Sequence, residues 1–236
     1  MNTIDALIAW TPFLIGGFVW NILIATAAMA LGTAAGAALG WLRLSPRRWV
    51  QRVSTGATEL SRNVPTIVFQ FYLALMLPSE WPVPGTHWVV GVPAWIKASL
   101  ALAVAVVGFT SDNLLIALRD WRAGKHSAAL LFVPAWGTYL LIIVIASSTA
   151  SIIGVGELVS RSNSVINATA NTSLMIPIYL YAALIFFLFC YPLIAALKRV
   201  RARLAARLAQ APAAARAAPV QPIATEGMSA PAHRIR

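Results

Sequence analysis

The sequence predicts an all-α membrane protein that crosses the lipid bilayer five times, with its N-terminus outside and its C-terminus in the cytoplasm. Of its 236 residues, 59% are hydrophobic and 11% are charged, and the mean hydropathy is +0.76. Soluble domains do not have such a composition. The apolar residues stand in runs rather than in alternation, which favours helices over a β-barrel. A helix needs roughly 20 apolar residues to cross the hydrocarbon core, and several runs approach or exceed this length.

The chain divides into a lead-in, a membrane domain and a basic tail. Residues 1–13 form a periplasmic lead-in, residues 14–200 the transmembrane domain, and residues 201–236 a tail that is expected to be mostly disordered. Five spans are expected in the domain, at about 14–42, 64–80, 95–118, 130–148 and 174–197. The second span is short, so we expect it to be tilted or completed by neighbouring residues.

The first span carries glycine at every fourth position towards its end, at Gly32, Gly36 and Gly40. Residues at this spacing form one stripe along a helix. Small side chains in such a stripe let a second helix approach closely in lipid. We expect the stripe to pack within one subunit rather than to form a dimer seam.

The polar stretch at 43–63 is expected to form a helix on the inner membrane surface. Three large apolar residues can share one face of it: Trp49, Val53 and Leu60. Such a face is typical of an amphipathic helix that lies in the plane of the interface. Glu59 and Arg62 stand three residues apart and are expected to form an ion pair on this helix. Pro65 follows directly and can begin the next helix.

The orientation follows from the distribution of lysine and arginine. Residues 43–63 hold five, residues 119–129 hold three and the stretch from Lys198 onward holds eight, whereas Lys97 and Arg161 are the remaining two. Basic residues accumulate on the cytoplasmic side of membrane proteins, so the three basic stretches are expected there. An odd number of spans then places the N-terminus outside. The net charge of +11 is therefore a feature of topology and of contact with membrane lipid, not a sign of nucleic-acid binding.

Few patterns in the sequence indicate chemistry. The phosphate loop G-x-x-x-x-G-K and the nucleophile elbow G-x-S-x-G are both absent, so the chain does not bind ATP by that loop. Cys190 has no cysteine partner, and the three histidines are scattered along the chain. We expect no catalytic residue, no metal and no bound cofactor on this chain.

Asp112 and Gln70 are polar residues in or near apolar runs. A carboxylate near the end of a span is costly in lipid and usually faces a partner or a water-filled cavity. Two interpretations stay open for Asp112. It lines a solute path, for which Gln70 is a second candidate, or it pairs near the cytoplasmic interface with Arg119 or Arg122.

Residues 119–130, RDWRAGKHSAAL, connect two apolar runs and are charged and rich in small side chains. We expect a cytoplasmic loop with one or two turns of helix, entered at Gly124. Its small side chains would leave the backbone open to the surface of a partner. The candidate docking residues are Gly124, Lys125, His126, Ser127, Ala128 and Ala129. The alternative is a plain solvated connection between two helices.

Three short motifs stand in order along the chain. The first precedes the second span and has the spacing E-x-x-R-x-x-P, at Glu59, Arg62 and Pro65. The second joins Phe109 and Asp112 to the GKHSAA of residues 124–129. The third occupies residues 147–158 of the outer connection and ends on Gly154, Glu157 and Leu158.

Together these motifs resemble those of the histidine/glutamine permease family, the membrane subunits of bacterial ABC importers for polar amino acids and opines. The family patterns are E-x-x-R-G-x-P, then an aromatic residue and an acid followed by G-Q-x-E-A-A, then T-S-L-x-x-x-I-G-V-x-E-L. The chain departs from them at Asn63, which replaces a glycine, and at Lys125 and Ser127, which replace a glutamine and a glutamate. The likeness covers residues 10 to about 208.

The resemblance implies the fold of a type I ABC importer permease in the bacterial cytoplasmic membrane. It implies a second permease subunit, like or unlike, two cytoplasmic ATPase subunits that bind ATP and Mg²⁺, and a periplasmic solute-binding protein. Residues 124–129 would dock into an ATPase and transmit its closure to the helices. Because Ser127 replaces the glutamate and the segment up to Pro134 is short, docking would be weaker, left to the partner half, or made to an unusual ATPase.

Two other classes of function remain open. A membrane-bound lipid-processing enzyme would use Asp112 and His126 near the inner interface as acid and base. A non-transporting assembly subunit would keep the membrane fold and carry a degenerate coupling loop. The sequence does not indicate the solute, since opines and basic or acidic amino acids all fit.

Overall fold

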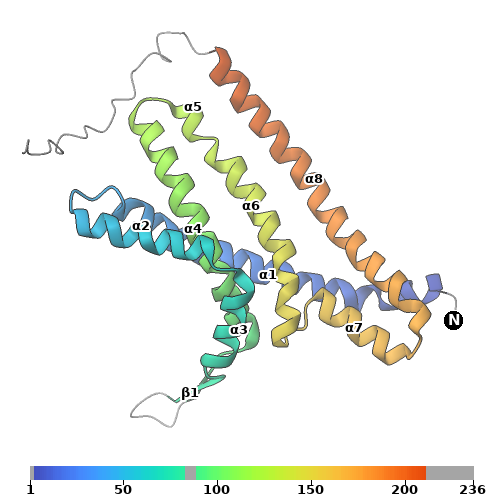
Figure 1. The fold of residues 1–236 in the computed structure, drawn as a ribbon. Helices are drawn as coiled ribbons and strands as arrows, with labels where there is room; N and C mark the ends of the chain where they lie inside the picture. The colour runs from blue at the N-terminus through green and yellow to red at the C-terminus, as the bar shows by residue number, and fades with distance from the viewer. Residues whose placement is uncertain (1–2, 83–88, 211–236) are drawn as a thin grey trace, which may run out of the picture.

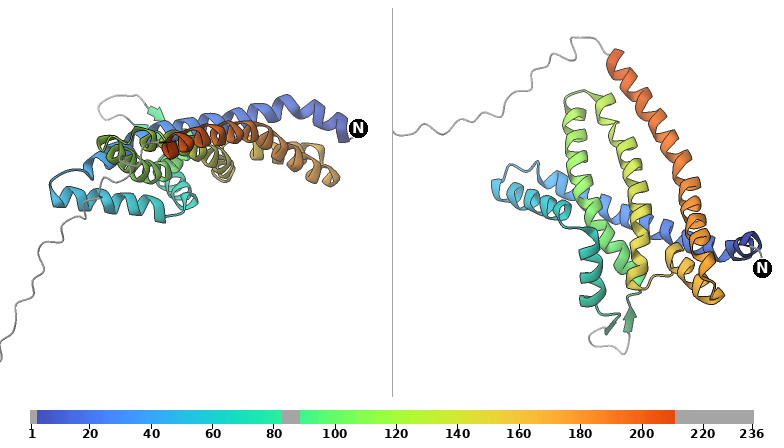
Figure 2. Two further views of the ribbon diagram at one scale, coloured as in Figure 1. Left: turned by 90° about the horizontal axis from the view of Figure 1, so that it is seen from above. Right: turned by 45° about the vertical axis from the view of Figure 1, so that its right-hand side comes forward.

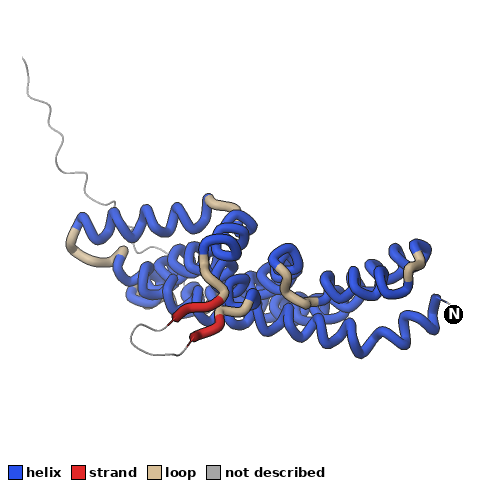
Figure 3. Tube along the Cα trace, turned by 90° about the horizontal axis from the view of Figure 1, so that it is seen from below, coloured by secondary structure: helices blue, strands red, loops and turns tan. Residues whose placement is uncertain are grey.

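The computed structural model describes residues 3–82 and 89–210 (Figure 1). Its elements are α1 (Thr3–Leu42), α2 (Arg48–Asn63), α3 (Thr66–Met76), β1 (Glu80–Pro82), β2 (Val89–Gly91), α4 (Ala94–Arg122), α5 (His126–Ala129), α6 (Phe132–Ala146), η1 (Ser147–Ile153), α7 (Leu158–Thr169), η2 (Thr172–Leu174) and α8 (Met175–Gln210). The described part is helical, as predicted, apart from one feature. Figure 3 shows the short antiparallel pair of strands β1 and β2, which joins α3 to α4 and which the sequence did not predict.

Four helical stretches in the described part are long and apolar enough to cross a membrane. They are Thr3–Leu42, Ala94–Arg122, His126–Ile153 and Thr172–Ala209. The predicted second span is α3, a helix of 11 residues. It rises by about 16 Å, whereas the hydrocarbon core is about 30 Å thick, so α3 cannot cross the membrane by itself. Five crossings therefore stay a prediction.

Two predicted boundaries differ from those of the structure. Most of the predicted lead-in belongs to α1, which begins at Thr3 and carries Pro12 within the helix. A proline is tolerated in a membrane helix because neighbouring groups satisfy the backbone that it frees. At the other end, α8 continues to Gln210, so the first ten residues of the predicted tail are helical. Residues 211–236 lie outside the described part.

The centre of the fold is the contact between α1 and α4, and the glycine stripe makes it. A Cβ atom at Gly32 would lie 2.4 Å from Val106 Cβ, and one at Gly36 would lie 2.7 Å from the carbonyl oxygen of Val107. The two backbones therefore approach as closely as only glycine allows. The predicted packing within one subunit is confirmed, and a core of buried apolar residues, among them Ile24 and Leu102, lies beside the stripe.

The helix α2 packs against α4 with small polar side chains instead of apolar ones. Ser54, Thr58 and Ser61 are its buried residues, and Thr58 Oγ1 lies 2.9 Å from Ser111 Oγ on α4. Its large apolar residues are exposed: Trp49, Val53 and Leu60. The predicted helix and its apolar face are confirmed. The location of this face on the inner membrane surface stays a prediction.

The helix α3 ends where a buried lysine of α4 meets its last carbonyl groups. Lys97 Nζ donates to the carbonyl oxygen of Leu77 at 2.7 Å and to Ser79 Oγ at 3.3 Å. A cation at this position offsets the negative end of the helix dipole. Lys97 is only 5% exposed, so this charge belongs to the junction of α3 and α4 rather than to an outer loop.

Figure 1 shows α4, α6 and α8 as three long helices, with the short α5 at one end and α7 at the other. α1 crosses behind them, and both views of Figure 2 show the same layer of helices from other sides. α8 is largely exposed, and it lies further from α6 at its N-terminal end, beside α7, than at its C-terminal half. The connection between the predicted fourth and fifth spans is mostly helical, as η1 and α7.

Candidate functional site

The loop predicted to dock a partner forms a tight turn between α4 and α6. The chain reverses at Gly124, whose φ of 75° lies in the left-handed region that favours glycine. The amide of Lys125 donates to the carbonyl oxygen of Asp120 at 2.8 Å, which closes the turn. α5 follows as a single turn of four residues. The predicted turn of helix, entered at Gly124, is therefore present.

The six candidate docking residues do not all face outward. Gly124 and His126 are exposed, and the His126 ring packs edge-on against Trp121, with the ring centroids 4.4 Å apart. Two more are half-buried, Lys125 and Ser127. Ala129 is buried, and Ala128 lines a cavity between α4, α6 and α8. Ala129 thus packs α5 against the long helices, and the half-buried Ala128 faces the cavity. That the small side chains leave the backbone open to a partner stays a prediction.

Asp112 joins three elements at the C-terminal half of α4. Its carboxylate accepts from Arg43, which directly follows α1, and from Arg62, in the last turn of α2. The predicted pairing with Arg119 or Arg122 is wrong. Those residues lie seven and ten positions further along the same helix, which is a rise of about 10 to 15 Å.

The predicted ion pair between Glu59 and Arg62 is also not formed. Arg62 turns across the interface to Asp112, and the side chain of Glu59 is exposed. An ion pair on the surface of one helix is worth a few tenths of a kcal/mol. The side chain of Asp112 is only 24% exposed, so water screens its attraction for Arg62 less than it screens that of the exposed Glu59. Pro65 behaves as predicted, because α3 begins at the next residue, Thr66.

A cavity of about 490 Å³ opens beside Asp112, between α2, α3, α4 and α6. Its polar lining brings together a cation, an anion, an amide and a phenol, from Arg62, Asp112, Asn113 and Tyr139. The ring of Tyr139 stacks on Phe109, with the centroids 3.9 Å apart. Such a lining can bind a polar molecule that carries both a positive and a negative group.

Gln70, the second candidate for a solute path, does not line this cavity. It is 1% exposed, and its side chain extends from α3 to η1, where its Oε1 accepts from Thr149 Oγ1 at 2.8 Å. Its Nε2 is buried and has no hydrogen-bond partner within the described residues. The two candidates therefore belong to different places in the fold.

The outer motif builds the junction of η1 with α7. Gly154 ends η1 with a φ of 88°, which again favours glycine. Glu157 is the N-cap of α7, and its carboxylate accepts from the amides of Val159 at 3.0 Å and Ser160 at 2.8 Å. Leu158 is fully buried as the first residue of that helix. The sequence therefore carries both the stop of one helix and the start of the next.

Asn21 of α1 completes this junction from the far end of the sequence. Its Nδ2 donates to Glu157 Oε2 and to Ser147 Oγ, each at 3.0 Å, and its Oδ1 accepts from the amide of Leu158 at 3.1 Å. All of these side chains are fully buried. Burial raises the pKa of Glu157 above its ordinary value, and the hydrogen bonds from Val159, Ser160 and Asn21 lower it in part.

The geometry contradicts an acid and base pair made of Asp112 and His126. His126 packs on Trp121, nine residues beyond Asp112 on α4, which corresponds to about 13 Å along the helix. The two groups of such a pair must reach one bond. Within residues 3–82 and 89–210, no three His, Cys, Asp or Glu side chains gather as metal ligands would.

Two residues of these sites were missed because their partners are distant in sequence. Arg43 was counted as one of several cytoplasmic basic residues, yet it holds Asp112. Asn21 is a polar residue within the first predicted span, and the cost of such a residue in lipid is the signal that points to a buried partner. Nothing in the sequence indicates which partner each one has.

The comparisons with known proteins give one likeness. No protein-family model and no curated protein matches the sequence. The fold is similar to a solved chain described as the crystal structure of an amino acid ABC transporter with histidines, with a TM-score of 0.72 and 16% sequence identity. The alignment covers 86% of this chain and 99% of that chain. At this identity the likeness establishes the fold: the protein is folded like a chain of an amino acid ABC transporter.

Proposed function

We propose that this chain is the permease subunit of an ATP-binding cassette importer for a polar amino acid or a related solute. The likeness of its fold to a chain of an amino acid ABC transporter carries the proposal. The three motifs of the sequence support it, because each makes a specific structural feature. These are the ion pair of Arg62 with Asp112, the turn at Gly124 and the helix cap at Glu157. The chain would work in the bacterial cytoplasmic membrane and would not itself be an enzyme.

The turn between α4 and α6 is the proposed contact with a cytoplasmic ATPase subunit, which would bind ATP and Mg²⁺. It exposes Trp121, Arg122, Gly124 and His126 at the end of two long apolar helices. An exposed aromatic ring beside a cation is a composition typical of protein interfaces. Because Ala128 and Ala129 face inward, movement of α5 would be passed directly to the helices that it packs on.

The helix α3 is the proposed contact with a second permease subunit. Only Gln70 of its eleven residues is buried, and the exposed side chains are large and apolar, for example Phe71, Tyr72 and Leu75. The cavity that Asp112 lines opens beside this helix. A second subunit on α3 would therefore close the cavity, and Asp112 with Arg62 would line the solute path. A periplasmic solute-binding protein would deliver the solute.

A transport assay tests this proposal. The tagged chain is purified from its native membranes together with the subunits that accompany it, and uptake of labelled polar amino acids is measured in vesicles with ATP inside and outside. Arg122→Glu is expected to abolish ATP-driven uptake while the subunit still inserts, because the reversed charge lies on the exposed turn. Arg203→Glu, an equal change on the exposed face of α8, is the matched control and is expected to transport.

The orientation is tested separately with a cysteine placed at the exposed His126. His126→Cys should react with a membrane-impermeant maleimide in inside-out vesicles and not in intact cells, while the native Cys190 is buried. Reaction from the outside would overturn the proposal. An assembly subunit without transport, the remaining alternative, would co-purify with partners yet show no uptake in the unaltered protein.

A further inference from the structure

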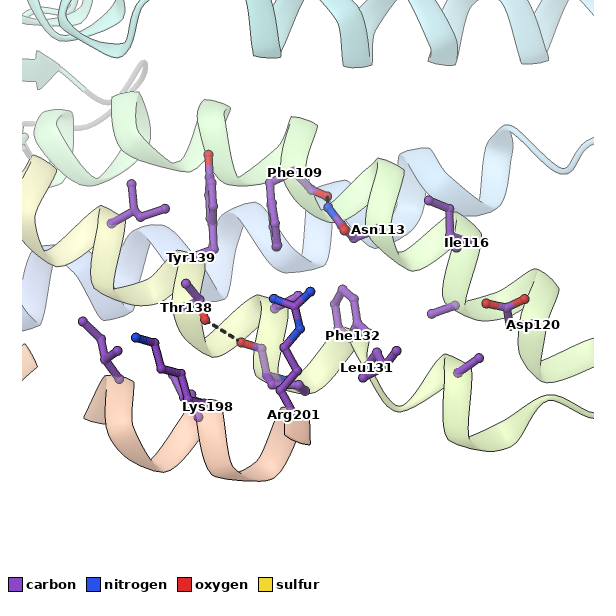
Figure 4. A pocket seen from close by; sticks show the side chains of 17 residues that line it. Phe109, Asn113, Ile116, Asp120, Leu131, Phe132, Thr138, Tyr139, Lys198 and Arg201 are labelled. Carbon is purple, nitrogen blue, oxygen red and sulfur yellow. Dashed lines mark hydrogen bonds between the residues drawn. The ribbon is translucent and has the colours of Figure 1, made fainter. Parts of the chain in front are cut away.

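A second cavity lies between α4, α5, α6 and α8 and has a volume of about 540 Å³, which is within the usual range for ligand sites. Its walls are mainly apolar. They include Ile116, Leu131, Phe132, Ile142, Ile194 and Leu197. The cavity lies beside the C-terminal half of α8, and we refer to it as the α8 groove (Figure 4).

Two cations stand at the edge of the α8 groove. Lys198 and Arg201 line it from α8 and are three residues apart, so they share one face of that helix. Both are exposed, and the two ion pairs of the described residues involve other arginines. Two cations beside an apolar cavity, with no carboxylate bound to them, leave a site for an anion attached to an apolar chain.

One carboxylate also lines the groove, that of Asp120 on α4. Figure 4 shows it beside Ile116, at the far end of the groove from Lys198, with Arg201 between the two. Its carboxylate forms no ion pair with either cation, since both ion pairs of the described residues involve Asp112. The two cations can therefore bind an anion, and apolar side chains of the groove, such as Ile142 and Ile194, can contact an apolar chain attached to it.

We propose that the α8 groove binds one anionic phospholipid of the cytoplasmic leaflet. Its phosphate lies between Lys198 and Arg201, and one acyl chain lies along the apolar walls. Basic pockets between membrane helices on the cytoplasmic side bind anionic headgroups for this reason. The basic residues of the 119–129 turn and of α8 gather at the same end of the molecule, which places the groove on that side.

A second copy of this chain fits the groove less well than a lipid does. The stretches of the chain that would meet Lys198 and Arg201 at that end are themselves basic, and the whole chain has a net charge of +11. Like charges at such a contact oppose association. An anionic lipid instead complements the two cations.

The bound lipid would fix the position of the proposed docking turn. Ala128 lines the groove, and α5 contacts both α4 and α8. A lipid in the groove therefore lies between α8 and the hairpin that carries Gly124 and His126. This site rests on the membrane location of the chain and does not depend on the transport function.

Native mass spectrometry of the full chain tests the site, with phosphatidylglycerol and phosphatidylcholine of identical acyl chains supplied together. The unaltered chain is expected to retain one phosphatidylglycerol in preference to phosphatidylcholine. The double variant Lys198→Gln, Arg201→Gln loses both cations, and its preference for phosphatidylglycerol should be lower by a factor of about ten. Arg199→Gln with Arg203→Gln removes the same charge from the same helix outside the groove and should keep the preference.

Equal loss of the preference in both double variants would overturn the proposal, because it would show only the general attraction of a basic helix. Ala135→Phe supplies a second arm, since it narrows the groove without changing charge. It should lower retention of both lipids, and unchanged retention would also overturn the proposal.

Glycerol phosphate, which has the headgroup but no acyl chain, should not compete; competition would assign the site to free phosphates. Loss of the lipid whenever two copies associate would assign the groove to a second copy.

Discussion

The two ends of the helix layer differ in what completes them. At one end, Glu157, Asn21 and Ser147 form a fully buried network in which the chain supplies every partner. At the other end, Gly124 and His126 of the turn between α4 and α6 are exposed. We refer to these regions, after the sides of the membrane on which the sequence predicts them, as the outer junction and the inner turn.

The difference shows that two short motifs of one chain can be required for different reasons, one by contacts within the chain and one by its exposure. The outer junction requires its polar residues because a buried polar group that loses its partner carries the full cost of desolvation. The inner turn carries no such internal constraint, apart from the left-handed φ of Gly124 and the inward packing of Ala128 and Ala129. The residues of the first region are explained by contacts within the chain, whereas the exposed residues of the second are explained only by the proposed partner.

The largest effect on stability is expected from Glu157→Ala. The substitution removes the cap of α7 and leaves the amides of Val159 and Ser160 without an acceptor, so the free energy of unfolding should fall by about 4 kcal/mol. Thermal unfolding of the detergent-solubilised protein measures it. Glu59→Ala, the same change at an exposed position, should alter the free energy of unfolding by less than about 0.5 kcal/mol. Equal effects at the two positions would contradict the comparison.

A glycine in each region gives the next largest effect. At Gly17 a Cβ atom would lie 2.9 Å from the backbone of Leu158, so Gly17→Ala must push α7 away from α1 and should cost about 2 to 3 kcal/mol. At Gly124 a Cβ atom meets nothing within 4 Å, and only the φ of 75° opposes the change. Gly124→Ala should therefore cost about 1 kcal/mol. Thermal unfolding of the two variants measures these costs. A larger loss of stability in Gly124→Ala than in Gly17→Ala would show that the inner turn is the more constrained region.

A smaller effect is expected at Asp112, which ties the C-terminal ends of α1 and α2 to α4. Arg62 is mostly exposed, so its ion pair is screened by water and salt. Asp112→Asn should lower the free energy of unfolding by about 1 kcal/mol at low salt and by less at high salt. Asp120→Asn, at a carboxylate outside the ion pairs of the described residues, is the control. A cost that does not change with salt would mean that Asp112 acts through its other contacts.

The sequence predicted the features that local patterns determine. The glycine stripe, the helix that exposes Trp49 and the start of α3 after Pro65 each follow from spacing or from one residue. The side-chain partners of Asp112 and Glu157 did not follow, because they lie 50 to 136 residues away and no pattern links them. The inward face of Ala128 was missed for a related reason: small side chains suit a close internal contact and an open surface equally well.

The smallest effect concerns pH, and it tests why the outer junction tolerates a buried carboxyl group. Burial raises the pKa of Glu157 in the folded protein, so the folded state holds this proton more tightly than the unfolded state does. Its contribution to stability is complete below the ordinary carboxyl pKa and is lost as the pH rises through the raised value. Glu157→Gln removes this dependence. The melting temperature of the unaltered protein should therefore fall relative to that of Glu157→Gln as the pH rises from about 4 towards neutrality, while Glu59→Gln shows no such trend. A melting temperature that instead rises relative to Glu157→Gln would mean that the three N–H donors outweigh burial, and that the junction is built for the ionised carboxylate.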